Sequence, residues 1–515
     1  MIRQTDKTAC ERLLQNAPAP TTPGTRRQML GGLMASLCLP AAWARPADAG
    51  RDDHPALSLS SAPDRQLLDD VCERTFRFFW DLANPANGLV PDRWPGNPKM
   101  ASVASVGFAL TAYVVGVDRG WIRRRQAAER CLATARFFAH APQGPQAAGV
   151  AGHHGFFYHF LDMQTGYRFG PGVELSTIDS ALLLAGLLCV QQYFDRQDPL
   201  EDEIRQLAQR VYERMDWRWV ERRPGLVCMG WNPESGFDSF IDYHGYDEAM
   251  LMVLLAMGSP THALGADAWT AFTRTYDRTW GRFMGQEHLG GAPLFWHQYS
   301  HVWVDFRGIQ DGYMRQRGMD YFENSRRATL SQQAYAIANP GGWNGYDAHH
   351  WGLTACDGPG MIQGPDHQGR TVQYYDYRAR GAGLRDTQDD GTIAPTAALS
   401  SLPFAPEIVL PTLRAMLASH GPHIYGRYGF LDSYNTSFRA WGAKLSDGRE
   451  VPGWGWVATD HLGIDQGPIV AMMANHRNGL IWKTMRRLPA LRNGLRKAGF
   501  RGGWLEARAA EKARG

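Results

Sequence analysis

The sequence predicts an all-α protein in which a ring of buried helices is wrapped by a second, outer ring. Helical periodicity dominates the chain from Asp64 onward. Runs such as Ala181–Val190 and Met250–Met257 are apolar on nearly every face, which is typical of helices that are buried all round. No repeat of fixed period is visible, so solenoid families with strict motifs are disfavoured.

About twelve helical segments are expected in a single domain. The first has a stripe of side chains from Leu68 to Leu82 at i, i+4, i+7, i+11 and i+14. Residues 153–162 alternate in a way that predicts a short hairpin. The long segments between helices are rich in Gly, Trp, Tyr, His and Asp, and functional sites are commonly built on such loops. The further helices are expected near 104–118, 124–140, 176–194, 199–215, 246–257, 266–284, 327–338, 395–401, 406–419, 466–476 and 479–497.

Residues 1–44 have the pattern of a twin-arginine (Tat) export signal. Arg26-Arg27 precede an uncharged run from Met29 to Ala44, which ends in the cleavage pattern Ala42-Trp43-Ala44. This run is shorter than the roughly 20 residues that span a bilayer, although an N-terminal anchor is the alternative. We therefore expect a periplasmic or secreted protein that meets the Tat translocon during export and has no stable membrane insertion after signal removal.

The rest of the chain is expected to hold one domain. Residues 45–62 are predicted to be a linker, residues 63–500 the helical domain and residues 501–515 a C-terminal tail. The five cysteines that follow the signal are widely spaced, without a C-x-x-C pair, so neither a disulfide framework nor a zinc ribbon is expected. Cys189 lies in an apolar run and is expected to be a buried thiol.

Charge excludes a polyanionic partner. The formal net charge is +3, and removal of residues 1–44 takes away five basic and two acidic side chains, which leaves 49 of each. A nucleic-acid protein normally has a basic excess, so no nucleic-acid partner is expected. The 18 tryptophans are either a large aromatic core or surfaces that stack on flat or ring-shaped ligands.

Four loops offer carboxylates for catalysis. Glu174 and Asp179 surround a Ser-Thr helix start, and Glu248 leads into an apolar helix, where partial desolvation would raise its pKa as a general acid requires. Asp432 lies in a Gly-bounded aromatic loop. Each has a structural alternative, as a helix-dipole or turn residue. Asp465 is interpreted mainly as an N-cap.

Motifs for other chemistries are missing from the sequence. It has no H-E-x-x-H, EF-hand loop, Walker A, G-x-G-x-x-G or G-x-S-x-G pattern, so no metal or cofactor is expected. Paired carboxylates, Trp-rich loops and an exported chain together favour glycan chemistry, because sugar rings stack on Trp and Tyr and two carboxyls suffice for glycoside hydrolysis.

Long, ordered motifs over roughly residues 65–498 resemble the glucoamylase-like domain of glycoside hydrolase family 144. That domain is similar to a processing domain of cyclic β-1,2-glucan synthases. The resemblance implies an (α/α)6 toroid and hydrolysis of the neutral polymer β-1,2-glucan, with inversion at the anomeric carbon. The segments that carry it are Thr75–Asp81, Asn87–Arg93, Glu174–Asp179, Tyr246–Met250, Gly258–His262, Gly352–Pro359, Ala394–Ser401 and Leu462–Pro468.

The resemblance also implies roles for individual residues. Glu248 matches the general acid and Asp432 the general base, although Ser433-Tyr434 replaces the usual Ala-Phe after that aspartate. Cys356 stands where the family usually has Ser. The residues expected to bind and position sugar rings are Glu174, Asp179, His154, Tyr246, Trp343, Trp351, Asp357 and Trp454.

Alternatives remain open at this stage. A retaining or transglycosylating enzyme would use two carboxyls about 5 Å apart, with Glu174 and Glu248 as the pair. A polysaccharide lyase would need a cationic site, which zero net charge disfavours, and a non-catalytic periplasmic glycan binder would tolerate loss of Glu248. The sequence does not distinguish endo from exo cleavage.

Overall fold

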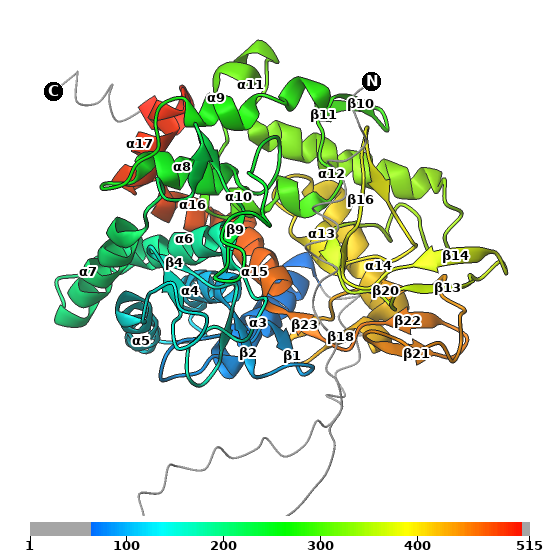
Figure 1. The fold of residues 1–515 in the computed structure, drawn as a ribbon. Coiled ribbons are helices and arrows are strands. Elements are labelled where there is room, and N and C mark those ends of the chain that lie inside the picture. Colours follow the sequence, from blue (N-terminus) through cyan, green and yellow to red (C-terminus); the bar gives the residue numbers. More distant parts are fainter. Residues whose placement is uncertain (1–62, 507–515) are drawn as a thin grey trace, which may run out of the picture. The chain divides into compact units, whose positions relative to one another are not determined.

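Inner and outer helices alternate along the chain in the computed structural model, which describes residues 63–506 (Figure 1). The inner helices are almost completely buried, whereas the outer ones each have an exposed side. The inner set is α4 (Val103–Asp118), α6 (Thr177–Tyr193), α8 (Met250–Gly258), α10 (Tyr299–Trp303), α13 (Pro395–Leu399) and α15 (Gly463–Asn478). The others are α3 (Asp64–Leu82), α5 (Arg124–His140), α7 (Pro199–Arg214), α9 (Ala268–Thr273), α11 (Gly312–Gln316), α12 (Tyr321–Ala338), α14 (Pro406–Ile424), α16 (Leu480–Met485) and α17 (Pro489–Lys497).

Glycines allow the inner helices to pack with their backbones in contact. A Cβ on Gly107 of α4 would lie 2.2 Å from the carbonyl oxygen of Leu182 in α6, and one on Gly186 would lie 2.2 Å from that of Gly107. Both values are far below van der Waals contact, so no larger side chain fits between these two helices.

The last inner helix closes the ring. Figure 1 shows α15 (orange) beside α3 and α4 (blue), with which it makes extensive contacts. A Cβ on Gly463 would meet Ser105, and one on Gly467 would meet Phe108, so α15 and α4 run parallel and in close contact. The chain is therefore an (α/α)6 toroid, as the sequence predicted.

Hydrogen bonds bring the N-terminal ends of the inner helices together. Thr396 in the first turn of α13 donates to the carbonyl of Asp465 in α15 (2.9 Å). Tyr299, which begins α10, donates to the carbonyl of Ile464 (3.3 Å). Ser300 donates to the carbonyl of Glu248, immediately before α8 (2.9 Å). This end of the toroid thus gathers several helix N-termini in one place.

Short strands decorate the loops, nearly all as two-stranded antiparallel ribbons. They are β1 (Arg93–Trp94), β2 (Met100–Ser102), β3 (Gly152–His153), β4 (Phe156–Phe157), β5 (Phe160–Asp162), β6 (Leu175–Ser176), β7 (Glu221–Arg223), β8 (Leu226–Val227), β9 (Gly230–Trp231), β10 (Trp280–Phe283), β11 (Gln286–Leu289), β12 (Ala355–Cys356), β13 (Ile362–Pro365), β14 (Thr371–Tyr374), β15 (Arg378–Ala379), β16 (Gly381–Ala382), β17 (Thr387–Gln388), β18 (Tyr425–Gly426), β19 (Gly429–Phe430), β20 (Tyr434–Asn435), β21 (Arg449–Val451), β22 (Gly455–Val457) and β23 (His461–Leu462). The pairing of β3 with β4 confirms the expected hairpin within residues 153–162.

Two predicted helices are wrong in extent. The segment 266–284 is α-helical only over α9, which ends at Thr273. A single 3-10 turn follows at Tyr276–Arg278, and the chain then enters the β10–β11 hairpin, whose turn residues Met284 and Gly285 adopt positive φ (44° and 82°). The segment 479–497 divides into α16 and α17, since Pro489 has no N–H and begins a new helix. The short helices α10 and α11 have no amphipathic pattern long enough to predict.

The C-terminal boundary also differs from the prediction. Arg501 exchanges backbone hydrogen bonds with Gln310, and Leu505 is buried, so residues 501–506 pack on the domain instead of starting a tail. The predicted export signal and linker lie outside the described residues. All five cysteines in the described part are buried and unpaired, which confirms the buried thiol at Cys189. No helix among residues 63–506 has the length and apolarity needed to cross a membrane.

Replacing Gly186 by Ala should lower the free energy of unfolding by about 1–3 kcal/mol, because the new methyl group would force α4 and α6 apart. Urea denaturation would measure the change. Gly170→Ala is the matched control, since no atom lies within 4 Å of its added Cβ, and it should change stability by less than about 0.5 kcal/mol. Equal stability of both variants would contradict the close packing of the two helices.

Candidate active site

Three carboxylates lie at the N-terminal ends of three inner helices. Asp179 is in the first turn of α6 and Asp465 in that of α15, while Glu248 lies in the turn that leads into α8. A helix N-terminus carries partial positive charge from its free N–H groups, which favours an anion there by typically 0.3–1 kcal/mol. Convergence of these ends therefore gives a place where several carboxylates can be gathered.

Glu248 has the environment of a proton donor. Its carboxyl group is only partly exposed, and burial, helped by the nearby charge of Asp179, raises its pKa to about 7. The neighbouring Asp247 is buried and accepts a hydrogen bond from the amide of Ala249 (2.9 Å). A carboxyl group with a pKa near 7 is half protonated at neutral pH and can donate a proton.

His159 joins the two carboxylates of the helix-start motif. Its Nδ1 lies 2.7 Å from Glu174 Oε1, and its Nε2 lies 3.7 Å from Asp179 Oδ2. Burial opposes a charge on the ring, but Asp179 and Glu174 outweigh it and raise the pKa of His159 to about 10. Ser176, the N-cap of α6, donates to Asp179 as well (2.5 Å). His159 is therefore an imidazolium at neutral pH.

Arg93 is the second cation of the site and meets four carboxylates. Its guanidinium group lies 3.0 Å from Asp357, 3.1 Å from Asp447, 3.5 Å from Asp92 and 3.7 Å from Asp460. Its strand, β1, pairs with β23, which leads directly into α15. Asp357 and Asp460 are almost completely buried, so one guanidinium group holds together loops that are hundreds of residues apart in the sequence.

Asp432 and Asp465 form a buried carboxyl pair. Asp432 Oδ2 accepts hydrogen bonds from the amide of Asp357 (2.7 Å) and the hydroxyl of Ser433 (3.3 Å). Asp432 Oδ1 and Asp465 Oδ2 are buried and lack any other partner in the described chain, and the two carboxyl groups contact each other. One shared proton would satisfy both oxygens.

The pKa shifts agree with one shared proton. Burial, and then the charge of Asp465, raises the pKa of Asp432 well above its ordinary value. Burial also raises the pKa of Asp465 to about 7. Two carboxylates this close cannot both ionise at little cost, so the pair has one negative charge near neutral pH.

These groups form one continuous set, which we call the acid cluster. Coulombic contacts link Glu248 to Asp179, Asp92 to Asp179 and His159, and Asp357 to Asp432. Among the described residues, its paired cations are Arg93 and His159. Its carboxyl groups belong to Asp92, Glu174, Asp179, Asp247, Glu248, Asp357, Asp432, Asp447, Asp460 and Asp465.

The structure brings together half of the predicted site residues. Glu174, Asp179, Glu248, Asp357 and Asp432 all belong to the acid cluster. This is the convergence that a two-carboxyl mechanism requires.

Two predicted sugar contacts are corrected. Trp351 is completely buried and donates to Thr412 (2.8 Å), and Tyr246 is 4% exposed and packs against Tyr321 and His297. Neither ring presents a face to a ligand, because the core covers both. Their aromatic character was interpreted as a platform, whereas they fill the interior.

Three further predicted residues occupy other places on the surface. His154 stacks on Trp219 (4.3 Å between ring centroids). Trp343 donates its indole N–H to Asp389 (2.8 Å), and Trp454 donates to His420 (3.3 Å). All three are partly or fully exposed. None makes a direct polar contact with the acid cluster among the described residues.

Sequence reasoning missed Arg93, His159 and the role of Asp465. Arg93 ends one of the family-like segments, and His159 lies in the predicted hairpin, but nothing local shows that they meet acids from distant loops. Asp465 was interpreted as an N-cap, whereas Leu462 is the N-cap of α15. The carboxylate of Asp465 instead faces Asp432.

A separate groove of about 640 Å³ lies at the C-terminal ends of α6 and α8. It is lined by residues such as Gln191, Arg205, Tyr212, Gly258 and Leu488, and no carboxylate or histidine lines it. Without an acid or base it offers no means of moving a proton, so the acid cluster is the better candidate for catalysis.

Comparisons with known proteins show which family the chain resembles. Residues 241–489 match the family model Glycoamylase, described as "Putative glucoamylase". A "putative glucoamylase" structure from Bacteroides uniformis is 31% identical, covers 86% of this chain and 99% of its own, and superposes with a TM-score of 0.72.

Two characterised relatives are named for β-1,2-glucan chemistry. The endo-β-1,2-glucanase from Chitinophaga pinensis, solved with sophorotriose and glucose, is 28% identical over 86% of this chain and 100% of its own, with a TM-score of 0.72. The exo β-1,2-glucooligosaccharide sophorohydrolase (non-reducing end) from Parabacteroides distasonis is 28% identical over 87% of this chain. The chain spans 60% of the length of that relative.

The charge on His159 should make folding stability depend on pH. Its pKa in the folded protein is above the unfolded value of 6.5, so its stabilisation is complete below about pH 6.5 and is lost as the pH rises through about 10. We expect His159→Gln to remove about 2 kcal/mol at pH 6.5 and much less at pH 10, after allowance for the exposed quarter of the ring. Urea denaturation across this range measures the difference, and an equal loss at both pH values would contradict the charged pair.

Proposed function

The chain belongs to the glucoamylase-like family, glycoside hydrolase family 144, and from that premise we propose that it hydrolyses β-1,2-glucan by an inverting mechanism. The observation that carries the proposal is that one cluster contains both a protonated carboxyl group and a carboxylate. Glu248 is poised to donate a proton, while the Asp432–Asp465 pair retains a negative charge that can accept one.

In the proposed reaction, Glu248 acts as the general acid. It protonates the glycosidic oxygen as the bond to the anomeric carbon breaks, so that the leaving sugar departs as an alcohol. Its partial burial and the nearby charge of Asp179 keep it protonated up to about pH 7. Glu248 becomes a carboxylate and regains its proton from solvent between turnovers.

Asp432 is proposed as the general base. It removes a proton from water that attacks the anomeric carbon from the opposite face, directly or through a substrate hydroxyl. The amide of Asp357 and the hydroxyl of Ser433 hold Oδ2, so Oδ1 takes the proton when the shared proton lies on Asp465. Asp465 shares a proton with this carboxylate. After turnover, Asp432 can lose its extra proton through Asp465 and become a base again.

The electrostatics of the cluster support a neutral polysaccharide as substrate. Ten carboxyl groups and two cations give the site a strongly negative field even when several carboxyls are protonated. A uronic acid or another anionic sugar would be repelled, which disfavours a lyase, whereas glucose hydroxyls donate hydrogen bonds to carboxylates. The exposed rings of His154, Trp343 and Trp454 are proposed to contact longer glucan chains.

We also propose that the protein is exported through the Tat route to the periplasm or beyond. The support is the Arg26-Arg27 pair with its apolar run and A-x-A site. Fractionation of cells that express the full chain, compared with an Arg26→Lys, Arg27→Lys variant, tests this. Retention of the double variant in the cytoplasm is expected, and equal export would contradict the Tat assignment.

Linear β-1,2-glucan is the substrate that tests the function. We expect short oligosaccharides whose first-formed anomer, observed by NMR within one half-life, is α, because inversion converts a β linkage. Asp432→Asn should abolish turnover while the protein remains folded. A first-formed β anomer would favour the retaining alternative with Glu174 and Glu248, and chromatography of early products separates endo from exo cleavage.

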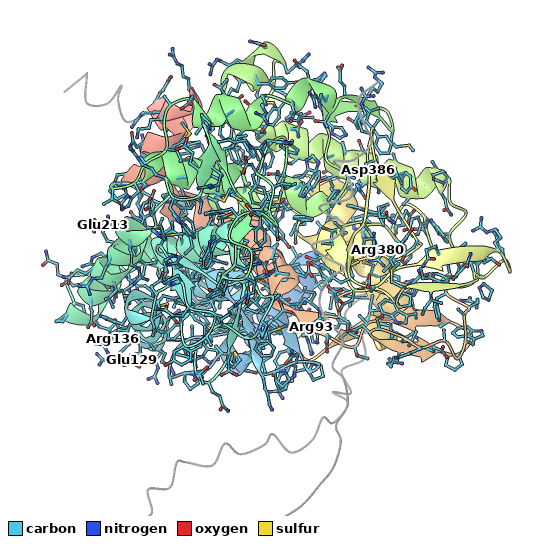
Figure 2. The ribbon with its side chains drawn as sticks, viewed as in Figure 1. Arg93, Glu129, Arg136, Glu213, Arg380 and Asp386 are labelled. Atoms are coloured by element: carbon cyan, nitrogen blue, oxygen red, sulfur yellow. The ribbon has the colours of Figure 1, made fainter. Side chains whose placement is uncertain are left out.

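Glu248→Gln should lower kcat at least about 100-fold, because the amide cannot protonate the leaving oxygen. In the unmodified protein, kcat should fall as the pH rises through about 7, since Glu248 then loses its proton. Glu129→Gln is the matched control, because Glu129 is exposed at the periphery of the molecule on α5 (Figure 2). Retention of more than a tenth of the activity in Glu248→Gln would remove Glu248 from the mechanism.

A further inference from the structure

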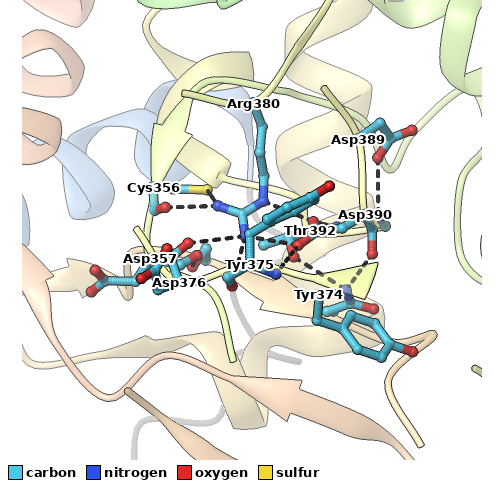
Figure 3. A network of polar contacts seen from close by, with 12 residues as sticks. Cys356, Asp357, Tyr374, Tyr375, Asp376, Arg380, Asp389, Asp390 and Thr392 are labelled. Atoms are coloured by element: carbon cyan, nitrogen blue, oxygen red, sulfur yellow. Dashed lines mark hydrogen bonds and ion pairs between the residues drawn. The ribbon is translucent and has the colours of Figure 1, made fainter. Parts of the chain in front are cut away.

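One peptide group is held at both of its ends. The carbonyl oxygen of Cys356 accepts a hydrogen bond from Arg380 Nη1 (2.8 Å), as Figure 3 shows. The N–H of the same peptide, on Asp357, donates to Asp432 Oδ2 (2.7 Å). A single planar amide thus connects a guanidinium group to the carboxylate proposed as the general base.

The guanidinium group of Arg380 is fixed by its surroundings. It is completely buried and forms a two-pronged pair with Asp390, from Nε to Oδ1 (2.8 Å) and from Nη2 to Oδ2 (2.9 Å). Nη2 also donates to the carbonyls of Tyr375 and Asp376 (3.2 Å each). Asp390 in turn accepts from the amides of Tyr375 and Thr392. Nη1 has a second contact with Cys356 Sγ (3.6 Å), so every nitrogen of this planar cation is held and the group cannot rotate.

A glycine follows the connected peptide and gives Arg380 the room to reach it. A Cβ on Gly358 would lie 2.1 Å from Arg380 Nη2 and 2.3 Å from the carbonyl oxygen of Tyr375. The backbone and the guanidinium group therefore approach more closely than any side chain would permit.

We propose that Arg380 is a positioning residue for the reaction, which acts on Asp432 through the Cys356–Asp357 peptide. Its charge polarises that peptide and fixes the direction of the N–H that holds Asp432 Oδ2. The proposal rests on the proposed function, because it requires Asp432 to be the base. Arg380 itself touches neither substrate nor reacting atoms in this scheme.

A structural role alone does not account for these contacts. A buried ion pair gives little net stability, since desolvation of both charges offsets most of their attraction. Here Arg380 has more N–H groups than Asp390 can accept, and one of them donates to the carbonyl of Cys356, in the peptide that holds the base. Hydrogen bonds in series polarise one another, so an N–H whose carbonyl faces a cation is a stronger donor.

The consequence for Asp432 has a definite sign. Burial raises the pKa of Asp432, and the hydrogen bond from the Asp357 amide opposes that rise by stabilising the carboxylate. Weakening this donor should therefore raise the pKa of the base. Activity on the acid side of the pH profile would then be lost at a higher pH.

The test compares pH profiles of kcat/KM and kcat on linear β-1,2-glucan. For Arg380→Gln we expect the acid limb to move up by about one pH unit, which is a tenfold loss of rate on that limb. KM should stay within about twofold, since no substrate contact is removed. Arg380→Lys keeps the charge but not the planar guanidinium group, so its acid limb should lie between those of the unmodified protein and of Arg380→Gln.

Arg370→Gln is the matched control. Arg370 also pairs with a buried aspartate, Asp366, in the neighbouring β13–β14 ribbon, but it does not reach the Cys356–Asp357 peptide. Its removal should leave the acid limb in place. If Arg380→Gln fails to fold, Gly358→Ala decides, because its added methyl group clashes with the guanidinium group and with the Tyr375 carbonyl and so disturbs the Arg380 contacts without removing any charge, and the same upward movement is expected.

The outcomes separate this inference from the proposed function. The positioning role is overturned if the unmodified protein cleaves the glucan but the acid limb does not move in folded Arg380→Gln. If Arg380→Gln does not fold, an unmoved acid limb in Gly358→Ala has the same meaning. An upward movement in Arg370→Gln as well would also overturn it, because the effect would then follow general loosening. Absence of turnover by the unmodified protein, or normal activity of Asp432→Asn, would instead overturn the proposed function.

Discussion

The parallel arrangement of the inner helices is the constraint on which the site depends. Because α6, α8 and α15 present their N-terminal ends at the same end of the toroid, their partial positive charges fall where Asp179, Glu248 and Asp465 lie. Carboxyl groups are costly to bury without such compensation. The close packing of α4 against α6 and α15 leaves these helices little freedom to spread, so the architecture fixes the positions of Asp179 and Asp465.

Within that frame the acid cluster has two halves with different tasks. On one side Glu248 retains its proton because it is desolvated near Asp179, and on the other Asp432 shares a proton with Asp465. His159 and Arg93 each contact more than one carboxylate. Because few cations lie among many acids, the carboxyl groups of the cluster have different pKa values. Acid–base catalysis requires such a difference between its acid and its base.

The sequence predicted the inner helices correctly, because a helix that is buried on all sides has an apolar pattern that can be recognised locally. The inner helices were predicted because they are apolar on nearly every face. Glu174, Asp179 and Glu248 were singled out because they stand at the start of such helices, Asp432 because it lies in a Gly-bounded aromatic loop, and Asp357 because it belongs to a family-like segment. Failures occurred where long-range contacts decide. Trp351 and Tyr246 are aromatic residues of the kind that stack on sugars, yet packing of distant helices buries them. The segment 280–289 forms a β-hairpin turned at Met284-Gly285 where a continuing helix was predicted.

The sequence alone therefore determined the fold class, five of the ten carboxyl residues of the acid cluster and a near-neutral net charge, since these follow from pattern, motif and composition. Only the tertiary structure decided which cations meet those acids and how their protons are divided. Arg93 contacts carboxylates up to 367 positions away, at Asp460, and Arg380 reaches Asp432 only through a peptide of a third loop. Such contacts depend on closing the ring of helices, for which no short stretch of sequence holds the information.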